Sequence, residues 1–196
     1  MRLSTSEGEM AGRSRTVFGL SRAARVGVFA ALSYGINAPL LAIPNIELFS
    51  LGLFLSGVFL GAIDGLATAI VAGIILVFFN PNGPQTIFLV GLAQLIGFAL
   101  FGLGGGALRR LVLRNGDPRR VALILTVVGA ILTFWYDLST NLAFALFFGP
   151  FWPVMIGGLG FGVLHIVSNG VIFGASSLVI QRIWKRIEYF MPPLAG

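Results

Sequence analysis

The chain has 196 residues, of which 57% are hydrophobic and only 10% charged, with a mean hydropathy of +0.95. Soluble domains carry about 25% charged residues, so this composition excludes an ordinary soluble fold and indicates an integral membrane protein. The absence of cysteine excludes disulfides and thiolate metal sites. The net charge of +6 does not indicate nucleic-acid binding, because the basic residues flank apolar runs, where they orient helices and contact anionic lipid.

The apolar runs predict one all-α membrane domain over residues 21–187. A membrane-spanning helix needs about 20 residues at roughly 1.5 Å rise per residue. Six helices are expected, over residues 22–43, 46–60, 64–79, 85–108, 120–148 and 154–184. Residues 1–20 are polar and mixed in charge, which predicts a flexible cytoplasmic segment, and residues 188–196 predict a short cytoplasmic tail.

The second and third helices are separated by a break within one long apolar stretch. Residues 46–79 are too many for a single crossing, and Gly61 and Gly65 flank the charged Asp64. The other helices are separated by turns rich in Pro, Gly and Asn, at residues 80–84, 114–118 and 149–153. Trp152, in the last of these turns, suits the level of the lipid headgroups.

The positions of the basic residues predict the topology. All 13 Lys and Arg residues fall into three clusters, over residues 2–25, 109–120 and 182–186. Cytoplasmic segments collect Lys and Arg, so all three clusters are expected on the cytoplasmic side. The chain then crosses an even number of times between clusters. This favours six transmembrane helices over five, with both termini in the cytoplasm.

Polar side chains of these helices are expected in the outer half of the membrane or near its midplane. Asp137, for example, lies sixteen residues beyond Val121, roughly 24 Å from the inner boundary. The set comprises Tyr34, Asn37, Glu47, Asn80, Gln85, Gln94, Asp137, Asn141 and His165, with Tyr136 beside Asp137. An ionisable residue in hydrocarbon costs about 2.5–3.5 kcal/mol on insertion scales, so it usually faces the bundle interior or a wet cavity. The pattern predicts an outward-facing polar cup that binds a small molecule.

Purely structural roles would also fit these residues. Asn141, Asn169 and Gln94 could be interhelical hydrogen-bond contacts. Asp137 and His165 could form a purely structural pair, and Glu47 could simply begin a helix at the interface. Asp64 is expected to be a solvated residue at a helix start.

Two rows of small residues at four-residue spacing allow close helix approach. One comprises Ala23, Gly27, Ala31 and Gly35, and the other Gly65, Ala69 and Gly73. Each could pack inside the bundle, and the first could also dock a partner near the inner face. The glycine-rich stretch 102–106 follows a helix rather than a strand, so it indicates a flexible or closely packed inner end of the fourth helix, not a nucleotide loop.

Motifs for catalysis are missing. Lys185 is the only lysine and no Walker A sequence occurs, so the chain is not expected to hydrolyse ATP by that route. One histidine without cysteine leaves no ordinary zinc site. We therefore expect a transport protein without a cofactor rather than an enzyme.

With six helices, cytoplasmic termini and a basic middle loop, the chain resembles the substrate-binding S component of energy-coupling factor (ECF) vitamin transporters. The resemblance also covers the row in residues 25–31 and the segment NIELFSLGLFLSGVFLGAIDGLATAIVAG, residues 45–73. It implies a multi-pass protein of a prokaryotic plasma membrane, with a transmembrane coupling subunit and two ATPase subunits as partners. It also implies that Ala23, Gly27 and Ala31 contact the coupling subunit, and that the S component topples to release substrate inside. Glycine at position 27 departs from the family's usual alanine row.

The substrate is expected to be a neutral or cationic, ring-containing micronutrient. The outer half offers no Lys or Arg to pair with a carboxylate or phosphate. Thiamine-like, queuosine-like or corrinoid molecules fit better than biotin, folate or pantothenate, although backbone amides of residues 80–85 could capture an anion. Four aromatic residues could stack on a ring or hold a cation, namely Trp135, Tyr136, Phe151 and Trp152.

Two other functions remain possible from the sequence. A stand-alone secondary transporter would be expected to show inverted repeats and broken helices at the midplane. A ligand-free structural protein of the membrane would use the polar residues for packing alone.

Overall fold

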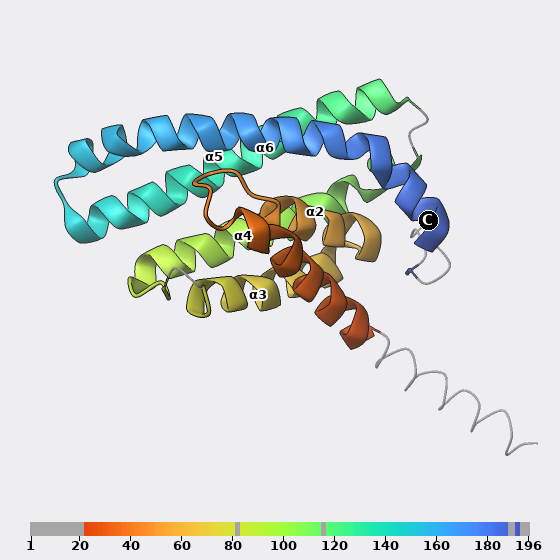
Figure 1. Cartoon of the computed structure of the whole chain (residues 1–196), viewed down its shortest axis with the longest axis horizontal. Coiled ribbons are helices and arrows are strands. Elements are labelled where there is room, and N and C mark those ends of the chain that lie inside the picture. Colours follow the sequence, from red (N-terminus) through yellow and green to blue (C-terminus); the bar gives the residue numbers. More distant parts are fainter. Residues whose placement is uncertain (1–21, 81–82, 115–116, 188–190, 193–196) are drawn as a thin grey trace, which may run out of the picture.

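The protein, described here from a computed structural model, consists of helices and their connections throughout the described residues, 22–80, 83–114, 117–187 and 191–192 (Figure 1). An N-terminal helix covers residues 22–37. It is followed by the short 3-10 helix η1 (Ala38–Leu40), α2 (Phe49–Leu60), α3 (Ala62–Phe78), α4 (Phe88–Arg114), α5 (Pro118–Phe148) and α6 (Phe151–Ile187). The predicted flexible segment 1–20 lies outside the described residues, as does all of the predicted tail except 191–192.

The predicted break between the second and third helices is confirmed at Gly61. Its φ of 99° lies in the left-handed region that favours glycine. The first helix ends at residue 37 instead of 43, because the proline at position 39 disfavours helical backbone before it. Residue 152, expected in a turn, lies in the first turn of α6, where Pro153 is tolerated.

Three helices are long and apolar enough to cross a membrane, namely α4, α5 and α6. With 12 and 17 residues, α2 and α3 would be roughly 18 and 26 Å long, whereas the hydrocarbon core is about 30 Å thick. Within α2, all residues except Leu55 are buried. This short helix is therefore enclosed by protein rather than presented to lipid. Crossing by all six predicted helices stays a prediction.

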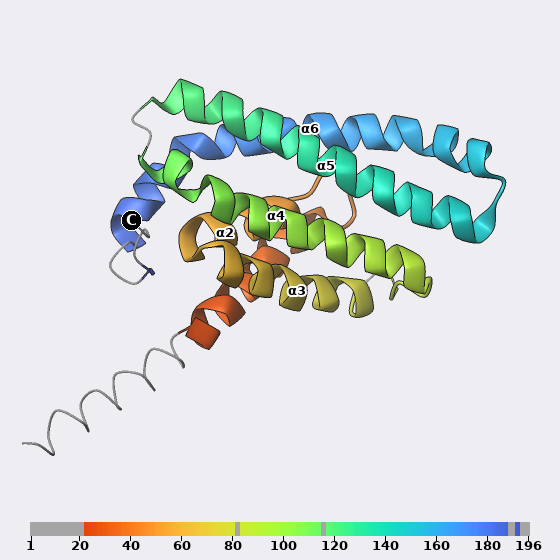
Figure 2. The ribbon, with the colours of Figure 1, turned by 180° about the vertical axis from the view of Figure 1, so that it is seen from behind.

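The helices form two packed groups, as Figures 1 and 2 show: an antiparallel hairpin of α5 and α6, and a group containing α2, α3 and α4. Aromatic side chains join the groups. The ring of Phe173 on α6 lies 5.2 Å from that of Phe54 on α2 and 5.9 Å from that of Phe101 on α4. All three are fully buried, so the core is continuous across the two groups.

Glycines bring α2, α3 and α4 into backbone contact. A Cβ added at Gly65 would lie 2.5 Å from the Cα of Gly57, and one added at Gly105 would overlap the carbonyl oxygen of Phe54. The interpretation of residues 102–106 as closely packed is therefore confirmed. The row of residues 65, 69 and 73 is buried and packs inside the bundle.

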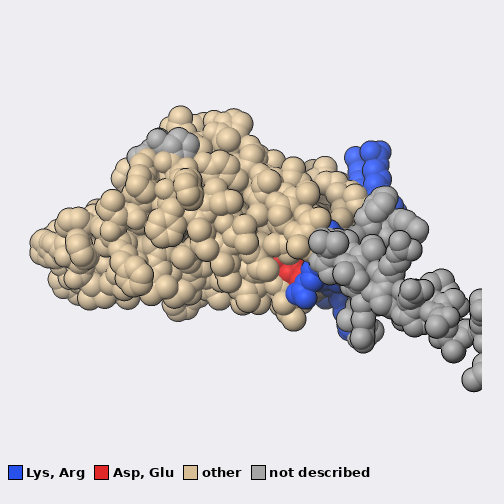
Figure 3. Space-filling model, turned by 90° about the horizontal axis from the view of Figure 1, so that it is seen from below, with Lys and Arg blue, Asp and Glu red and all other residues tan. Residues whose placement is uncertain are grey.

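Basic side chains gather at one end of the molecule, where Asp64 also lies. On the face seen in Figure 3, basic side chains lie at the end where the described part of the chain begins. The prediction of a solvated Asp64 was wrong: this residue is only 8% exposed, and its Oδ1 accepts a hydrogen bond from Arg22 Nε at 2.6 Å. Arg109 is also buried, and it donates to the carbonyl oxygens of Val58 and Phe59 at the end of α2. These arginines satisfy buried oxygens at the break near Gly61.

Substitution of Gly105 by alanine is expected to destabilise the fold by about 1–3 kcal/mol, because the new methyl group overlaps the backbone of α2. The matched control is Gly35→Ala on the N-terminal helix, where no atom lies within 4 Å of the added Cβ. That change should stabilise the helix by about 0.5–1 kcal/mol. Thermal unfolding in detergent measures both, and equal midpoints for the two variants would contradict the packing described.

Candidate functional site

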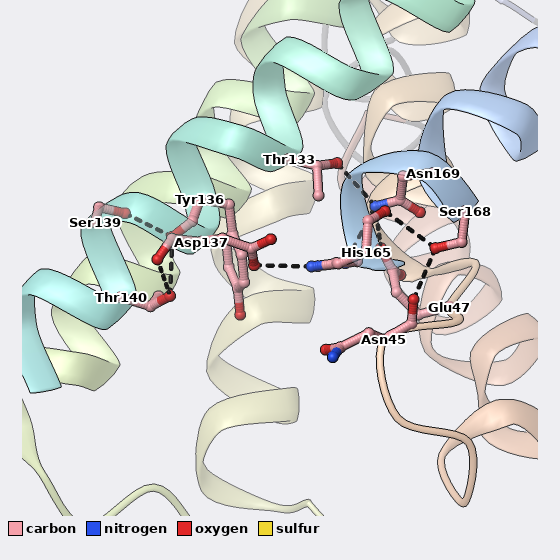
Figure 4. A network of polar contacts seen from close by, with 10 residues as sticks. All are labelled: Asn45, Glu47, Thr133, Tyr136, Asp137, Ser139, Thr140, His165, Ser168 and Asn169. Carbon is pink, nitrogen blue, oxygen red and sulfur yellow. Dashed lines mark hydrogen bonds and ion pairs between the residues drawn. The ribbon is translucent and has the colours of Figure 1, made fainter. Parts of the chain in front are cut away.

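His165 on α6 lies between two carboxylates that come from different parts of the chain (Figure 4). Its Nδ1 is 2.8 Å from Oδ1 of Asp137 on α5. Its Nε2 is 3.7 Å from Oε1 of Glu47, which precedes α2. The imidazole therefore joins the α5–α6 hairpin to the segment that leads into the other group of helices.

Asn169, one turn further along α6, completes this network. Its side chain is fully buried, and Nδ2 donates to Thr133 Oγ1 at 2.9 Å and to Glu47 Oε1 at 3.1 Å. The same nitrogen lies 3.2 Å from His165 Nε2. The interhelical role expected for Asn169 is confirmed, and its amide bonds Glu47 directly but reaches Asp137 only through His165.

The segment before α2 is held in place by its own set of hydrogen bonds. Ser168 on α6 donates to the carbonyl oxygen of Asn45 at 2.7 Å, and Asn37 Oδ1 accepts from the backbone N–H of Leu48 at 2.9 Å. Glu47 Oε2 accepts from the backbone N–H of Ser50 at 2.8 Å, which satisfies a donor in the first turn of α2. Glu47 thus acts both as a helix-start residue and as a member of the polar network.

A cavity of about 340 Å³ opens beside this network, between α4, α5, α6 and the segment before α2. Its lining includes six predicted binding residues, Glu47, Gln94, Tyr136, Asp137, Asn141 and His165. The prediction that these side chains converge is confirmed. Oδ2 of Asp137 is buried here and has no hydrogen-bond partner among the described residues.

Two smaller cavities adjoin the first through shared residues. One of about 280 Å³ is lined by Asn80, Gln85, Gln94 and Tyr136, among others. The other, of about 130 Å³, includes Asn37, Glu47 and Asn80 in its lining. Tyr136 lines all three, so its ring forms a wall common to the whole polar region.

Other predicted binding residues lie elsewhere. Successive residues of a helix point about 100° apart, so Trp135 faces away from the side on which Tyr136 lines the cavities. Trp135 is 54% exposed and packs against Phe134. Phe151 and Trp152 contact each other at the start of α6, outside these three cavities. The hydroxyl of Tyr34 donates to the carbonyl oxygen of Phe79 and does not reach these cavities either. The expectation of stacking by Trp135, Phe151 and Trp152 was therefore wrong for this site.

Several residues of the site were missed by the sequence analysis. Thr133 and Thr140 lie on the face of α5 that carries Asp137, and their spacing of four and three residues from it was an available signal. Asn45 and Phe161 also line or border the cavity. The spacing of four residues between Phe161 and His165 on α6 was a further available signal. No local pattern places Asn45 there, since only the folding of the chain brings the segment before α2 against α6.

The expected structural pair of Asp137 and His165 is present as a hydrogen bond. The network nevertheless exceeds such a pair, because it adds a second carboxylate and borders a cavity.

No cluster of three or more potential metal ligands occurs among the described residues. Comparison with protein-family models, curated proteins and solved structures found no match to the chain.

Replacing Glu47 should destabilise the fold. Glu47→Ala removes the oxygens that accept hydrogen bonds from the backbone N–H of Ser50 and from Nδ2 of Asn169, so about 1–3 kcal/mol of stability should be lost. Asp117→Asn, an exposed helix cap, is the control that should keep the wild-type stability. Thermal unfolding midpoints in detergent provide the comparison, and equal midpoints for all three proteins would contradict the role of Glu47.

Proposed function

We propose that this protein is the substrate-binding S component of an ECF-type transporter in a prokaryotic plasma membrane. It binds a ring-containing micronutrient from outside and delivers it into the cell. The observation that carries the proposal is the cavity in which Glu47, Asp137 and His165 meet amide and aromatic side chains inside an apolar helix bundle. Ionisable residues inside a membrane bundle usually mark a substrate pathway.

The proposed topology has six crossings, with both termini and all basic clusters in the cytoplasm. The charged end of the molecule then faces the cytoplasm (Figure 3). The cavity lies towards the opposite end and opens to the outside. In this arrangement α2 and α3 cross as a short pair, with α2 shielded from lipid by its neighbours.

The chemistry of the cavity favours a neutral or cationic substrate. The sequence has no Lys or Arg over residues 26–108 and 121–181, so no basic side chain from those stretches pairs with a carboxylate or phosphate. The cavity instead presents carboxylates, amides and the faces of Tyr136 and Phe161. Thiamine-like or queuosine-like molecules match this set better than biotin, folate or pantothenate.

The N-terminal helix supplies the proposed surface for the coupling subunit. Ala23, Gly27 and Ala31 are all exposed, and no atom lies within 4 Å of a Cβ added at Gly27. Their row is therefore not used for packing within the described part of the chain, unlike the row on α3. Small side chains permit close approach of a second helix. ATP hydrolysis is assigned to two partner ATPase subunits, because the chain has no Walker A sequence.

Native mass spectrometry of the protein, purified from its own membranes in mild detergent, should reveal a bound small molecule. Gly162→Leu is expected to abolish this binding, because the new side chain enters the cavity: a Cβ there would lie 3.7 Å from Asp137 Oδ2. The matched control is Gly160→Leu on the same helix, which faces open space and should keep the ligand. A bare wild-type chain, or equal loss from both variants, would contradict a binding function for this cavity.

A larger side chain in the small-residue row of the N-terminal helix should weaken association with the coupling subunit and the ATPases. Ala31→Leu is expected to reduce their co-purification at least about tenfold, which corresponds to roughly 1.4 kcal/mol of binding free energy. Leu32→Phe is the control, since it is exposed on a different side of the same helix. Ligand binding should be unaffected in both variants. Unchanged co-purification of Ala31→Leu would remove this row from the interface.

A further inference from the structure

The charges around the cavity do not balance. Glu47 and Asp137 each contribute a carboxylate, and His165 is the only basic side chain beside them in the part of the chain that the structure describes. The other neighbours of His165 are uncharged: Tyr136 on α5 and Asn169 on α6. Gln94, the contribution of α4 to the cavity, is also neutral. A positive charge on His165 leaves one negative charge in excess, and a neutral His165 leaves two.

The position of the unsatisfied charge is given by the hydrogen bonds. Oδ1 of Asp137 is taken by His165, and both oxygens of Glu47 are taken by Asn169 and Ser50. Among the carboxylate oxygens of the network, Oδ2 of Asp137 alone has no partner within the described residues, although it is buried. The amide oxygen Oδ1 of Asn169 is likewise buried without a partner there, but it carries no charge. This oxygen belongs to a residue that lines the cavity, and Gly162 leaves the space near it open.

A purely structural role does not explain this arrangement. A pair of one acid and one histidine would connect α5 to α6 with no excess charge. A buried carboxylate oxygen without a donor costs free energy, and an uncompensated charge costs more. A ligand that brings a positive charge and a hydrogen-bond donor to this oxygen would remove both costs, which explains why such a group is present.

We infer that the cavity is selective for a singly charged, ring-bearing organic cation, whose positive group pairs with Oδ2 of Asp137. This inference rests on the proposed binding function and narrows its substrate class. The cation restores neutrality when His165 is charged. The ring of the ligand lies beside Tyr136 and Phe161, which also line the cavity. Anions are excluded because they would add to the existing negative charge.

The experiment uses three small probes with the same ring and different charges: benzylammonium, benzyl alcohol and benzoate. Their binding to the full chain in lipid nanodiscs is measured by saturation-transfer NMR, with competition by excess benzylammonium to restrict the signal to saturable binding. Benzylammonium is expected to bind with a dissociation constant at least about tenfold lower than that of benzyl alcohol. The reason is that a charge pair in a partly buried site lowers the dissociation constant by more than this factor. Benzoate should not bind.

Two variants separate charge selectivity from loss of structure. Asp137→Asn keeps the size of the side chain and should reduce benzylammonium binding to the level of benzyl alcohol, whose own binding should not change. A collapsed cavity would instead lose both probes. Asp117→Asn, which removes a negative charge at the start of α5 far along the helix from Asp137, should bind all probes as the wild type does.

The outcomes distinguish this inference from the proposed function. Equal affinities for benzylammonium and benzyl alcohol, or an unchanged preference in Asp137→Asn, would overturn the charge selectivity and leave a site for neutral rings. Failure of all three probes to bind would also overturn it. The proposed function is tested separately, by native mass spectrometry of the purified chain. It stands if the wild type carries a small molecule that Gly162→Leu loses.

Discussion

The contact of His165 with Asp137 and Glu47 connects parts of the molecule that otherwise meet mainly through apolar packing. Aromatic contacts hold the α5–α6 hairpin against α2 and α4, but such packing is only weakly directional. The polar network sets the position of the segment before α2, since Asn45 and Glu47 are both bound to side chains of α6. The shape of the cavity depends on that position.

The opposite end of the bundle obeys a different constraint, close contact between backbones. Glycines of α2, α3 and α4 face one another near residue 61, where a side chain on any of Gly57, Gly65 or Gly105 would overlap a neighbouring helix. Arg109 satisfies carbonyl oxygens of α2 at the same end. Tight packing and charge pairing at this end, and a polar cavity towards the other, make the molecule asymmetric along its length, which fits the proposed binding of a substrate from outside.

The two acidic residues of the network differ in how their oxygens are used. Glu47 satisfies a donor at the start of α2 and contacts His165, so both of its oxygens are engaged. Asp137 uses one oxygen for His165 and leaves the other free of partners among the described residues. The structural bonds hold the acidic groups in place, and the remaining oxygen gives the cavity its chemical character.

The sequence alone predicted the helical class and the break at Gly61, because apolar runs and glycines are local signals. It also predicted that Glu47, Asp137 and His165 lie in one polar region, but the contact between the segment before α2 and α6 comes from the fold. It also indicated small-residue rows, but not which row would be buried. The packing of the helices places the row on α3 inside the bundle and leaves the row on the N-terminal helix exposed. In the folded chain Trp135 points away from the cavity, Asp64 bonds Arg22, and the carbonyl oxygen of Asn45 accepts from Ser168. These outcomes depend on how each helix is rotated about its axis and on contacts between residues far apart in the chain, and composition and spacing contain neither.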